Sequence, residues 1–288
     1  MLEKQNSSKL TFLQNNVGRR ANSMHTCLQI GVDQKIDFIL FQEPWMSDDN
    51  TFTISHSNYY CILPENKNVR SRVAIFARKK SNFQACLRSD ICSDNDLLII
   101  DIQDNKNQYA PIQLINIYNE KSLMEQNNSW TVNRSLLQLM PTKNSIICGD
   151  FNAHHPWWNS EIISEIRSQE LVDWLLFHDF TLINEPDRPT YFRQNLQRKS
   201  IIDLTFISAE LNESLTNWFI DDEEASGSDH EIIRFSVKLG TEELTENPLY
   251  ANQYNFEKAD WERILTETER LSKTKNFNGT RLKSMKIL

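Results

Sequence analysis

Acidic and amide side chains recur in this sequence at the ends of short apolar segments that are typical of buried strands. Asn16 follows one such segment, Glu43 follows the next, and Tyr118 ends a third. Asp150 and Asn152 come directly after another apolar segment. If the ends of these strands meet in the folded chain, their polar side chains converge on a single site.

Two further acids and a histidine complete this set. Asp203 lies in the apolar segment 200–205, and Asp229 and His230 precede the last such segment. An aspartate that accepts a hydrogen bond from a histidine orients the ring and stabilises its positive charge. The sequence therefore predicts an oriented histidine beside a group of carboxylates.

The combination suits the cleavage of a phosphodiester. That reaction needs a Lewis acid on the non-bridging oxygen, an activated water in line with the leaving group, and donors for the extra negative charge. Carboxylates and amides suit Mg²⁺, a hard ion that binds oxygen ligands. We therefore predict a site that uses Mg²⁺, with Mn²⁺ as a substitute.

Each of these residues has a simpler explanation when it is taken alone. A carboxylate at a strand end is usually a turn or cap residue. Tyr118 alone suggests a core aromatic with a tied hydroxyl, and Gly149-Asp150 alone suggests a turn. The whole set in this order is much less probable by chance than any one of its residues, so we interpret the set as functional.

The order of these pieces resembles the endonuclease/exonuclease/phosphatase superfamily, whose members include apurinic/apyrimidinic endonucleases and pancreatic deoxyribonuclease. No single piece is specific, but the combination over residues 10–238 is. In chain order the pieces are Leu13-Gln14-Asn15-Asn16, Gln42-Glu43-Pro44, Asn116-Ile117-Tyr118, Gly149-Asp150-Phe151-Asn152, Ile202-Asp203-Leu204-Thr205 and Ser228-Asp229-His230.

The resemblance implies which residues hold the metal. Glu43 would be a direct Mg²⁺ ligand, and Asn16 and Asp229 would lie beside the ion. The first motif contains two asparagines where one would suffice, so Asn15 stays open as the alternative to Asn16.

The resemblance also implies which residues act on the phosphate. Asp150 would orient or deprotonate the attacking water, while Asn152 and Tyr118 would donate hydrogen bonds to the scissile phosphate. His230, oriented by Asp203, would stabilise the charge that develops on the phosphoryl oxygens.

Finer details resemble one branch, the N-terminal endonuclease domain of non-LTR retrotransposon proteins. They are Gln42-Glu43-Pro44-Trp45, the segment 149–158 with its His-His-Pro-Trp-Trp ending, and Pro189-Thr190-Tyr191. In that family the domain nicks target DNA, and the freed 3′ hydroxyl primes reverse transcription. The resemblance therefore implies DNA as a partner, a reverse transcriptase domain that this chain does not contain, and an intracellular, nuclear location.

The basic segment 188–199 corresponds to a loop that contacts DNA in related enzymes. The resemblance thus implies Arg193, Tyr191 and Thr190 as substrate-binding residues, with His154 nearby. A solvated loop face is the alternative for such a segment. A zinc site at His154-His155 is poorly supported, because no spaced third ligand accompanies the two histidines.

Apolar, β-branched segments predict strands, and amphipathic segments predict helices. The predicted strands are 9–14, 37–42, 73–77, 97–102, 112–118, 145–148, 202–207 and 232–237, and the predicted helices are 22–35, 129–140 and 164–177. Strands and helices that do not alternate strictly favour an α+β fold. The resemblance narrows this to a four-layer α/β sandwich, with two packed, mostly antiparallel sheets flanked by helices.

Composition limits the function classes. No apolar run approaches the roughly 20 residues that span a bilayer, which predicts no membrane partner. The formal net charge of -8 argues against a general nucleic-acid coat. It allows a nuclease, in which an acidic cluster holds metal while the basic segments 67–80 and 188–199 meet phosphates. The five cysteines form no Cys-x-x-Cys pair, which predicts free thiols.

We predict that the domain ends near residue 238. Residues 239–288 are expected to be a polar linker and a charged helix at 256–275, the start of a truncated following region. Two other functions stay open. The protein could be another phosphoesterase of the superfamily (a phosphatase or an RNA deadenylase), or an inactive, truncated retroelement remnant.

Overall fold

The computed structural model describes residues 8–106, 108–120, 130–164, 166–193 and 198–239. Its strands form two six-stranded sheets and a small two-stranded sheet. None of the described helices is long and apolar enough to cross a membrane. The predicted linker and the predicted helix at 256–275 lie outside the described residues, and the predicted domain boundary stays a prediction.

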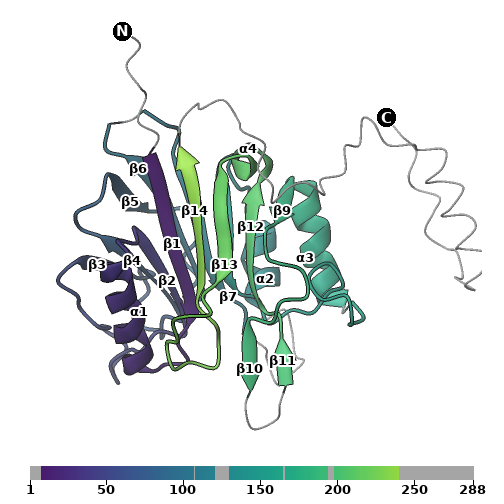
Figure 1. Cartoon of the computed structure of the whole chain (residues 1–288), viewed down its shortest axis with the longest axis horizontal. Coiled ribbons are helices and arrows are strands. Elements are labelled where there is room, and N and C mark those ends of the chain that lie inside the picture. The colour runs from purple at the N-terminus through teal and green to yellow at the C-terminus, as the bar shows by residue number, and fades with distance from the viewer. Residues whose placement is uncertain (1–7, 107, 121–129, 165, 194–197, 240–288) are drawn as a thin grey trace, which may run out of the picture. The chain divides into compact units, whose positions relative to one another are not determined.

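The first sheet contains both the first and the last described strand. Its spatial order is β13 (Leu215–Ile220), β14 (Ile233–Leu239), β1 (Ser8–Asn16), β2 (Phe38–Gln42), β4 (Val73–Arg78) and β3 (Tyr59–Ile62). β1 and β2 are parallel, and helix α1 (Ala21–Asp33) connects them. The other pairs are antiparallel. Met24 and Leu28 of α1 pack on Ile39 and Phe41, so this helix covers one face of the sheet (Figure 1).

The second sheet has a similar plan. Its spatial order is β5 (Phe83–Leu87), β6 (Leu97–Asp104), β7 (Ile112–Tyr118), β8 (Ser145–Asp150), β12 (Asp203–Ser208) and β9 (Phe180–Leu182). Only β7 and β8 are parallel. Its outer face is covered by α2 (Thr131–Arg134), the 3₁₀ turn η1 (Leu136–Gln138) and α3 (Ile166–Phe177). A short helix, α4 (Ala209–Asn212), follows β12, and β10 (Tyr191–Arg193) pairs with β11 (Arg198–Ser200).

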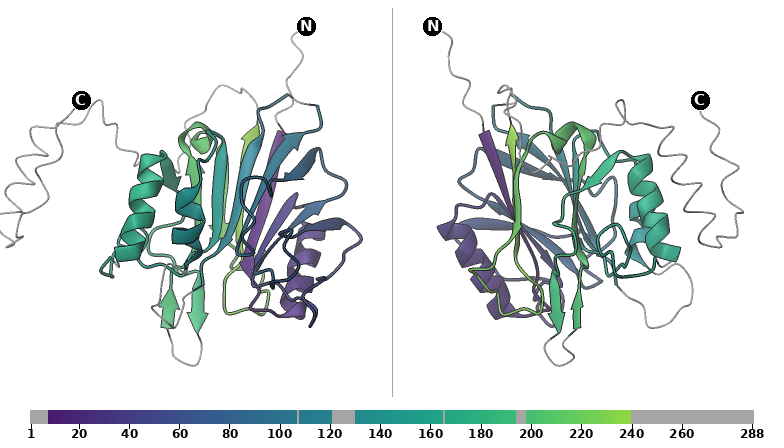
Figure 2. Two further views of the ribbon diagram at one scale, coloured as in Figure 1. Left: turned by 180° about the vertical axis from the view of Figure 1, so that it is seen from behind. Right: turned by 45° about the vertical axis from the view of Figure 1, so that its right-hand side comes forward.

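The inner faces of the two sheets pack against each other, so that helices lie outside both (Figure 2). β7, β8 and β12 are buried along their whole length, as strands covered on both faces must be. Several side-chain hydrogen bonds connect the two sheets. Gln42 Nε2 donates to Asn116 Oδ1 over 2.6 Å, and Asn116 Nδ2 donates to the carbonyl of Phe41. This is the predicted four-layer sandwich.

The predicted strands are all present, but one helix prediction is wrong. Residues 129–140 do not form a continuous helix, because Ser135 has φ -128° and ψ -56° and separates α2 from η1. The Ser135 hydroxyl donates to Asp94, and Arg134 forms an ion pair with the same carboxylate. These two contacts hold the chain at the break.

Gly149 occupies a position that tolerates no side chain. Its φ is +149°, and a Cβ atom built on it would lie 1.9 Å from the carbonyl oxygen of Ile117 in the neighbouring strand. We expect Gly149→Ala to lower the free energy of unfolding by about 3 kcal/mol or more, since strain and overlap add.

Urea unfolding measures this effect, and Gly18→Ala is the matched control. Gly18 also has a positive φ, +54°, but the nearest atom to an added Cβ is 4.0 Å away. The control should lose only about 1 kcal/mol. Equal losses in the two variants would show that the close approach of β7 is unimportant.

Candidate active site

Alternation along the strands explains why the predicted residues meet. Asn116 and Tyr118 are two residues apart on β7, so their side chains leave the same face of the strand. Asn116 contacts the other sheet, which makes this face the inner one. In the register of the second sheet, Asp150 pairs with Tyr118 on one side and with Asp203 on the other. Tyr118 and Asp150, which end their strands, and Asp203, which begins β12, therefore form one polar group between the sheets.

The two asparagines at the end of β1 point in different directions. Asn16 Nδ2 donates to Asp150 Oδ2 over 2.8 Å, a direct link between the two sheets. Asn15 Nδ2 donates instead to the backbone carbonyls of His230 and Glu231, each over 3.0 Å. The structure thus places Asn16 in the candidate site, while Asn15 holds the segment that carries His230.

Asp150 is buried, and hydrogen bonds hold both of its carboxylate oxygens. Oδ2 accepts from Asn16, and Oδ1 accepts from the backbone N–H of Asn152 over 3.0 Å. Asn152 has φ +44°, a conformation that turns the chain sharply after β8. Its Nδ2 donates to the carbonyl of Asn119 over 2.9 Å.

His230 and Asp203 form the predicted pair. His230 Nδ1 lies 2.9 Å from Asp203 Oδ2, and the His230 side chain is 10% exposed. The Tyr191 ring packs on the imidazole with a centroid distance of 4.7 Å. Because Nδ1 faces Asp203, Nε2 is the ring nitrogen that can face a substrate.

Three titratable groups of the site have shifted pKa values. Burial and the neighbouring Asp203 carboxylate raise the pKa of Asp150 from 3.8 to about 7. Burial alone would lower the pKa of His230, but Asp203 and Asp150 outweigh it and raise this pKa from 6.5 to about 9. Burial, Glu43 and Asp150 raise the pKa of the Tyr118 hydroxyl. At neutral pH, His230 is therefore a cation and Tyr118 is a hydrogen-bond donor.

The two predicted acidic metal ligands each form an ion pair with an arginine of one loop. Glu43 follows β2 with φ +46°, and its Oε1 lies 2.9 Å from Arg19 Nη2. Asp229 Oδ1 lies 3.1 Å from Arg20 Nη2, with both side chains 47% exposed. Arg19 and Arg20 were not predicted as site residues, although they follow Asn16 by only three and four positions.

The residues predicted to bind substrate have different surroundings. Thr190 is fully buried, and its hydroxyl accepts the backbone N–H of Ile202 and of Asp203. A side chain with no exposed surface cannot touch a substrate in this structure, so the substrate-binding role predicted for Thr190 is corrected to a role in holding Asp203. Tyr191 lies on His230, and the backbone of Arg193 pairs with that of Arg198 in the two-stranded sheet.

His154 lies in the loop after β8. Its backbone N–H donates to Ser168 Oγ over 3.1 Å, which ties this loop to α3. In the same loop, Trp158 is buried and its indole N–H donates to the carbonyl of Ala153. These tryptophan contacts belong to the core of the second sheet.

Among the described residues, one group of acids and histidines has ligand atoms within 4.8 Å of one another. It consists of Asp150, Asp203 and His230, and it excludes Glu43 and Asp229. Asp203 Oδ1 is buried and accepts no hydrogen bond. The donor set is rich in oxygen, and the pKa of Asp150 is raised by burial and then by repulsion from Asp203, which a cation would relieve. The residues present therefore fit a hard divalent cation.

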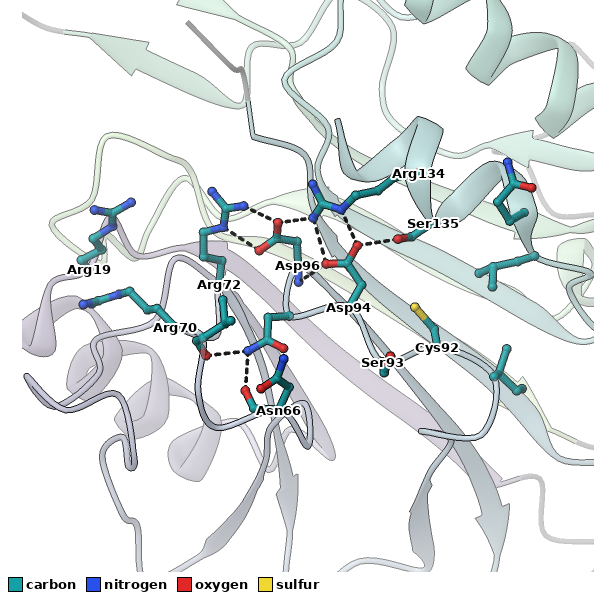
Figure 3. Close-up of a pocket in the computed structure, with 15 residues that line it drawn as sticks. Arg19, Asn66, Arg70, Arg72, Cys92, Ser93, Asp94, Asp96, Arg134 and Ser135 are labelled. Atoms are coloured by element: carbon teal, nitrogen blue, oxygen red, sulfur yellow. Dashed lines mark hydrogen bonds and ion pairs between the residues drawn. The ribbon is translucent and has the colours of Figure 1, made fainter. Parts of the chain in front are cut away.

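A pocket of about 890 Å³ is lined by Arg19, the partner of Glu43, and by Arg72, which lies over the Tyr118 ring. Arg19, Arg70, Arg72 and Arg134 line it together with Asp94 and Asp96. Figure 3 shows Asp96 between the guanidinium groups of Arg72 and Arg134, with ion pairs to both. The basic segment 67–80 thus contributes Arg70 and Arg72 to the edge of the candidate site.

Comparisons with known proteins agree with this architecture. Residues 112–234 match the family model described as endonuclease-reverse transcriptase. No curated protein matches the sequence significantly.

Several solved structures share the fold. The endonuclease domain of TRAS1, a telomere-specific non-LTR retrotransposon, has 20% identity and a TM-score of 0.64, covering 81% of this chain and 100% of that one. The apurinic/apyrimidinic endonuclease LMAP from Leishmania major has 14% identity and a TM-score of 0.61, over 81% and 88% of the two chains. The catalytic domain of Xenopus laevis APE2 has 14% identity and a TM-score of 0.58, over 85% and 99%.

The family match and the shared fold both agree with the resemblance that the six motifs indicate. The matched residues 112–234 contain the Tyr118, Asp150, Asp203 and His230 motifs. The structural matches cover about four-fifths of the chain. The resemblance is therefore confirmed: this chain is similar to the endonuclease/exonuclease/phosphatase superfamily and, within it, to the endonuclease domain of non-LTR retrotransposons.

Proposed function

We propose that this protein is a divalent-metal-dependent endonuclease that hydrolyses phosphodiester bonds in DNA. One observation carries the proposal. The buried group of Asp150, Asp203 and His230 lies where strand ends from both sheets meet, and Asn16 of the opposite sheet contacts it. Such a group can accept a proton and supply a fixed cation, and it is in contact with Asn16, one of the three predicted metal ligands.

Glu43, Asn16 and Asp229 are the residues that would hold the metal, which we take to be Mg²⁺ or Mn²⁺. When bound, the ion would supply Lewis acidity toward a non-bridging phosphate oxygen. In this structure the Glu43 carboxylate forms an ion pair with Arg19, and the Asp229 carboxylate forms one with Arg20. Metal and arginine would therefore compete for these oxygens, and displaced arginines would be available for DNA phosphates.

Asp150 is suited to accept the proton of the attacking water. Its raised pKa makes it a stronger base than an exposed aspartate. The hydrogen bond from Asn16 and that from the Asn152 N–H fix the direction of the carboxylate. A general base must lie within hydrogen-bond distance of the proton that it accepts, and these two hydrogen bonds keep the Asp150 carboxylate in a fixed position.

The other residues of the site are suited to bind the phosphoryl oxygens. His230, charged and oriented by Asp203, would stabilise negative charge through Nε2. Tyr118 would donate its hydroxyl hydrogen, since its raised pKa keeps the phenol protonated. Asn152 uses one Nδ2 hydrogen on Asn119, and the second would reach the phosphate.

DNA is the substrate that the relatives support. TRAS1 is a retrotransposon endonuclease and LMAP an apurinic/apyrimidinic endonuclease, by their descriptions. In this proposal, the enzyme nicks a chromosomal target in the nucleus, and the nick primes a reverse transcriptase that acts with it. The family description supports that association. Exposed Arg19 and Arg20 beside the site would meet the DNA backbone.

A substrate panel tests this function. Purified protein with Mg²⁺ should convert supercoiled plasmid to open circles, and should release neither phosphate from inositol phosphates nor adenylate from a polyadenylate tail. Phosphate release without nicking would favour a phosphatase. Shortening of the polyadenylate without nicking would favour a deadenylase.

Thermal unfolding with and without the metal tests the alternative of an inactive remnant. A ligand at 100 times its Kd stabilises the folded state by about 2.7 kcal/mol. Mg²⁺ or Mn²⁺ should therefore raise the Tm of the wild-type protein, and Glu43→Gln should lose most of that rise. An unchanged Tm at saturating metal would support the remnant.

A further inference from the structure

Arg72 lies at the start of β4 and connects the candidate site to the pocket beside it. Its side chain is 18% exposed. Nε and Nη2 donate to the two oxygens of Asp96, and Nη1 forms an ion pair with Glu120. Its guanidinium carbon lies 5.3 Å from the ring centroid of Tyr118. All five donors of a guanidinium lie in one plane, so these contacts also fix the plane that faces the ring.

Asp96 is a rigid anchor for this contact. Its side chain is only 4% exposed, and it also pairs with Arg134 of α2 (Figure 3). Its backbone carbonyl accepts the N–H of Tyr118 over 2.8 Å. The same residue therefore holds the main chain of Tyr118 directly and its ring through Arg72.

The main chain of Arg72 has a second, separate contact with the site. Its carbonyl oxygen accepts the backbone N–H of Glu43 over 2.8 Å. This contact involves no side-chain atom of Arg72, so a substitution of Arg72 changes the support of Tyr118 and retains the support of Glu43.

We propose that Arg72 is a positioning residue, which holds the ring of Tyr118 so that the hydroxyl meets the scissile phosphate. The inference rests on the proposed function. It does not make Arg72 a ligand of DNA, since Asp96 and Glu120 engage all three of its nitrogens. Arg72 acts through Tyr118, and its effect should depend on the Tyr118 hydroxyl.

The test is a double-mutant cycle with Arg72→Met and Tyr118→Phe, measured as kcat and KM for nicking of supercoiled plasmid. We expect Arg72→Met to lower kcat about 10-fold with KM nearly unchanged, a size that fits a desolvated cation–π contact. In the Tyr118→Phe background, Arg72→Met should have little further effect, since residues that act together are not additive. Arg72→Lys keeps the charge but loses the planar fork, and should recover only part of kcat.

The matched control is Arg88→Met. Arg88 also bridges two carboxylates, Asp90 and Asp101, and it lies on the strand pair β5–β6. It should leave kcat and KM unchanged. A rise of KM in Arg72→Met, or full additivity with Tyr118→Phe, would overturn the inference, because both would indicate that Arg72 acts on the DNA by itself.

A second measurement does not depend on activity. Urea unfolding of Arg72→Met, Tyr118→Ala and the double variant should reveal a coupling of at least about 3-fold in the unfolding equilibrium constant. Absence of coupling would overturn the inference even if the enzyme nicks DNA. If Arg72 and Tyr118 are coupled in a protein that does not nick DNA, the proposed function is overturned, and the contact between the two residues has no catalytic role.

Discussion

Replacing Asp150 by asparagine is expected to lower the rate of plasmid nicking by roughly 10²- to 10⁴-fold, the range of general-base contributions. Asparagine has nearly the same shape, but its single side-chain oxygen can accept only one of the two hydrogen bonds that Asp150 accepts, so the variant loses the proton acceptor and one of these bonds. The measurement is the initial rate of conversion of supercoiled to open-circular plasmid. Asp90→Asn is the matched control, since Asp90 is 64% exposed and pairs with Arg88 away from the site.

The same substitution should leave the metal-free fold intact. Burial and Asp203 disfavour the charged form of Asp150, as its raised pKa records. A neutral amide removes this repulsion, which offsets the hydrogen bond that it cannot accept, so the Tm of Asp150→Asn in EDTA should lie close to that of the wild type. Loss of rate with loss of Tm would mean that Asp150 mainly supports the fold, and an unchanged rate would remove it from the mechanism.

The second large effect is expected for His230→Ala. Removal of the imidazolium leaves the buried Asp203 carboxylate without its partner, which costs about 3 kcal/mol or more. Loss of a donor to the phosphoryl oxygens should lower the nicking rate by roughly 10²- to 10³-fold. Urea unfolding and the nicking assay measure the two effects separately.

The pH dependence of stability distinguishes this pair from an ordinary buried histidine. The folded-state pKa of His230 is raised from 6.5 to about 9, so its contribution is fully present below pH 6.5 and is lost as the pH rises through 9. The raised pKa of Asp150 has the same sign, with a contribution that is present below pH 3.8 and lost as the pH rises through 7. The metal-free wild type should therefore lose stability between pH 6.5 and 9.

Two controls define this result. His230→Ala should be less stable at pH 6 and should decline less steeply between pH 6.5 and 9, since Asp150 still titrates but His230 no longer does. A variant whose stability declines as steeply as that of the wild type would show that another group titrates there. EDTA must be present throughout, because a bound cation changes both pKa values.

The strands that carry the site could be predicted because the pattern that forms them lies within each segment of the sequence. Apolar, β-branched residues formed each of the predicted strands, and Asn16, Tyr118 and Asp150 stand at their ends. Six strands, β3, β5, β9, β10, β11 and β13, were not predicted. Exposed positions interrupt the apolar pattern of β13, and β9 has only three residues, so no periodicity could develop.

The other differences come from contacts between distant parts of the chain. The break at Ser135 depends on Asp94, 41 positions earlier. The burial of Thr190 follows from its hydrogen bond to the N–H of Asp203. The choice between Asn15 and Asn16 was decided by partners more than 130 positions away, Asp150 for one and His230 for the other. Motif spacing contains no information of this kind.

Arg72 illustrates the same limit. It belongs to a basic segment that the sequence suggests for phosphate binding, yet its side chain is engaged by Asp96 and Glu120. Exposed Arg19 and Arg20 are better suited to meet DNA, but nothing in their spacing reveals that they pair with Glu43 and Asp229. The charge runs therefore suggested contacts with phosphates but did not identify the contact residues, and DNA as a partner came from the resemblance.

The central claim is that the strand ends of the two sheets form a metal-dependent DNA endonuclease site. The most direct test incubates the wild-type protein with supercoiled plasmid in Mg²⁺, in EDTA, and in EDTA followed by excess Mg²⁺. We expect open circles in the first and third conditions and none in the second. Nicking that persists in EDTA, or a plasmid that stays supercoiled in Mg²⁺ and in Mn²⁺, would contradict it.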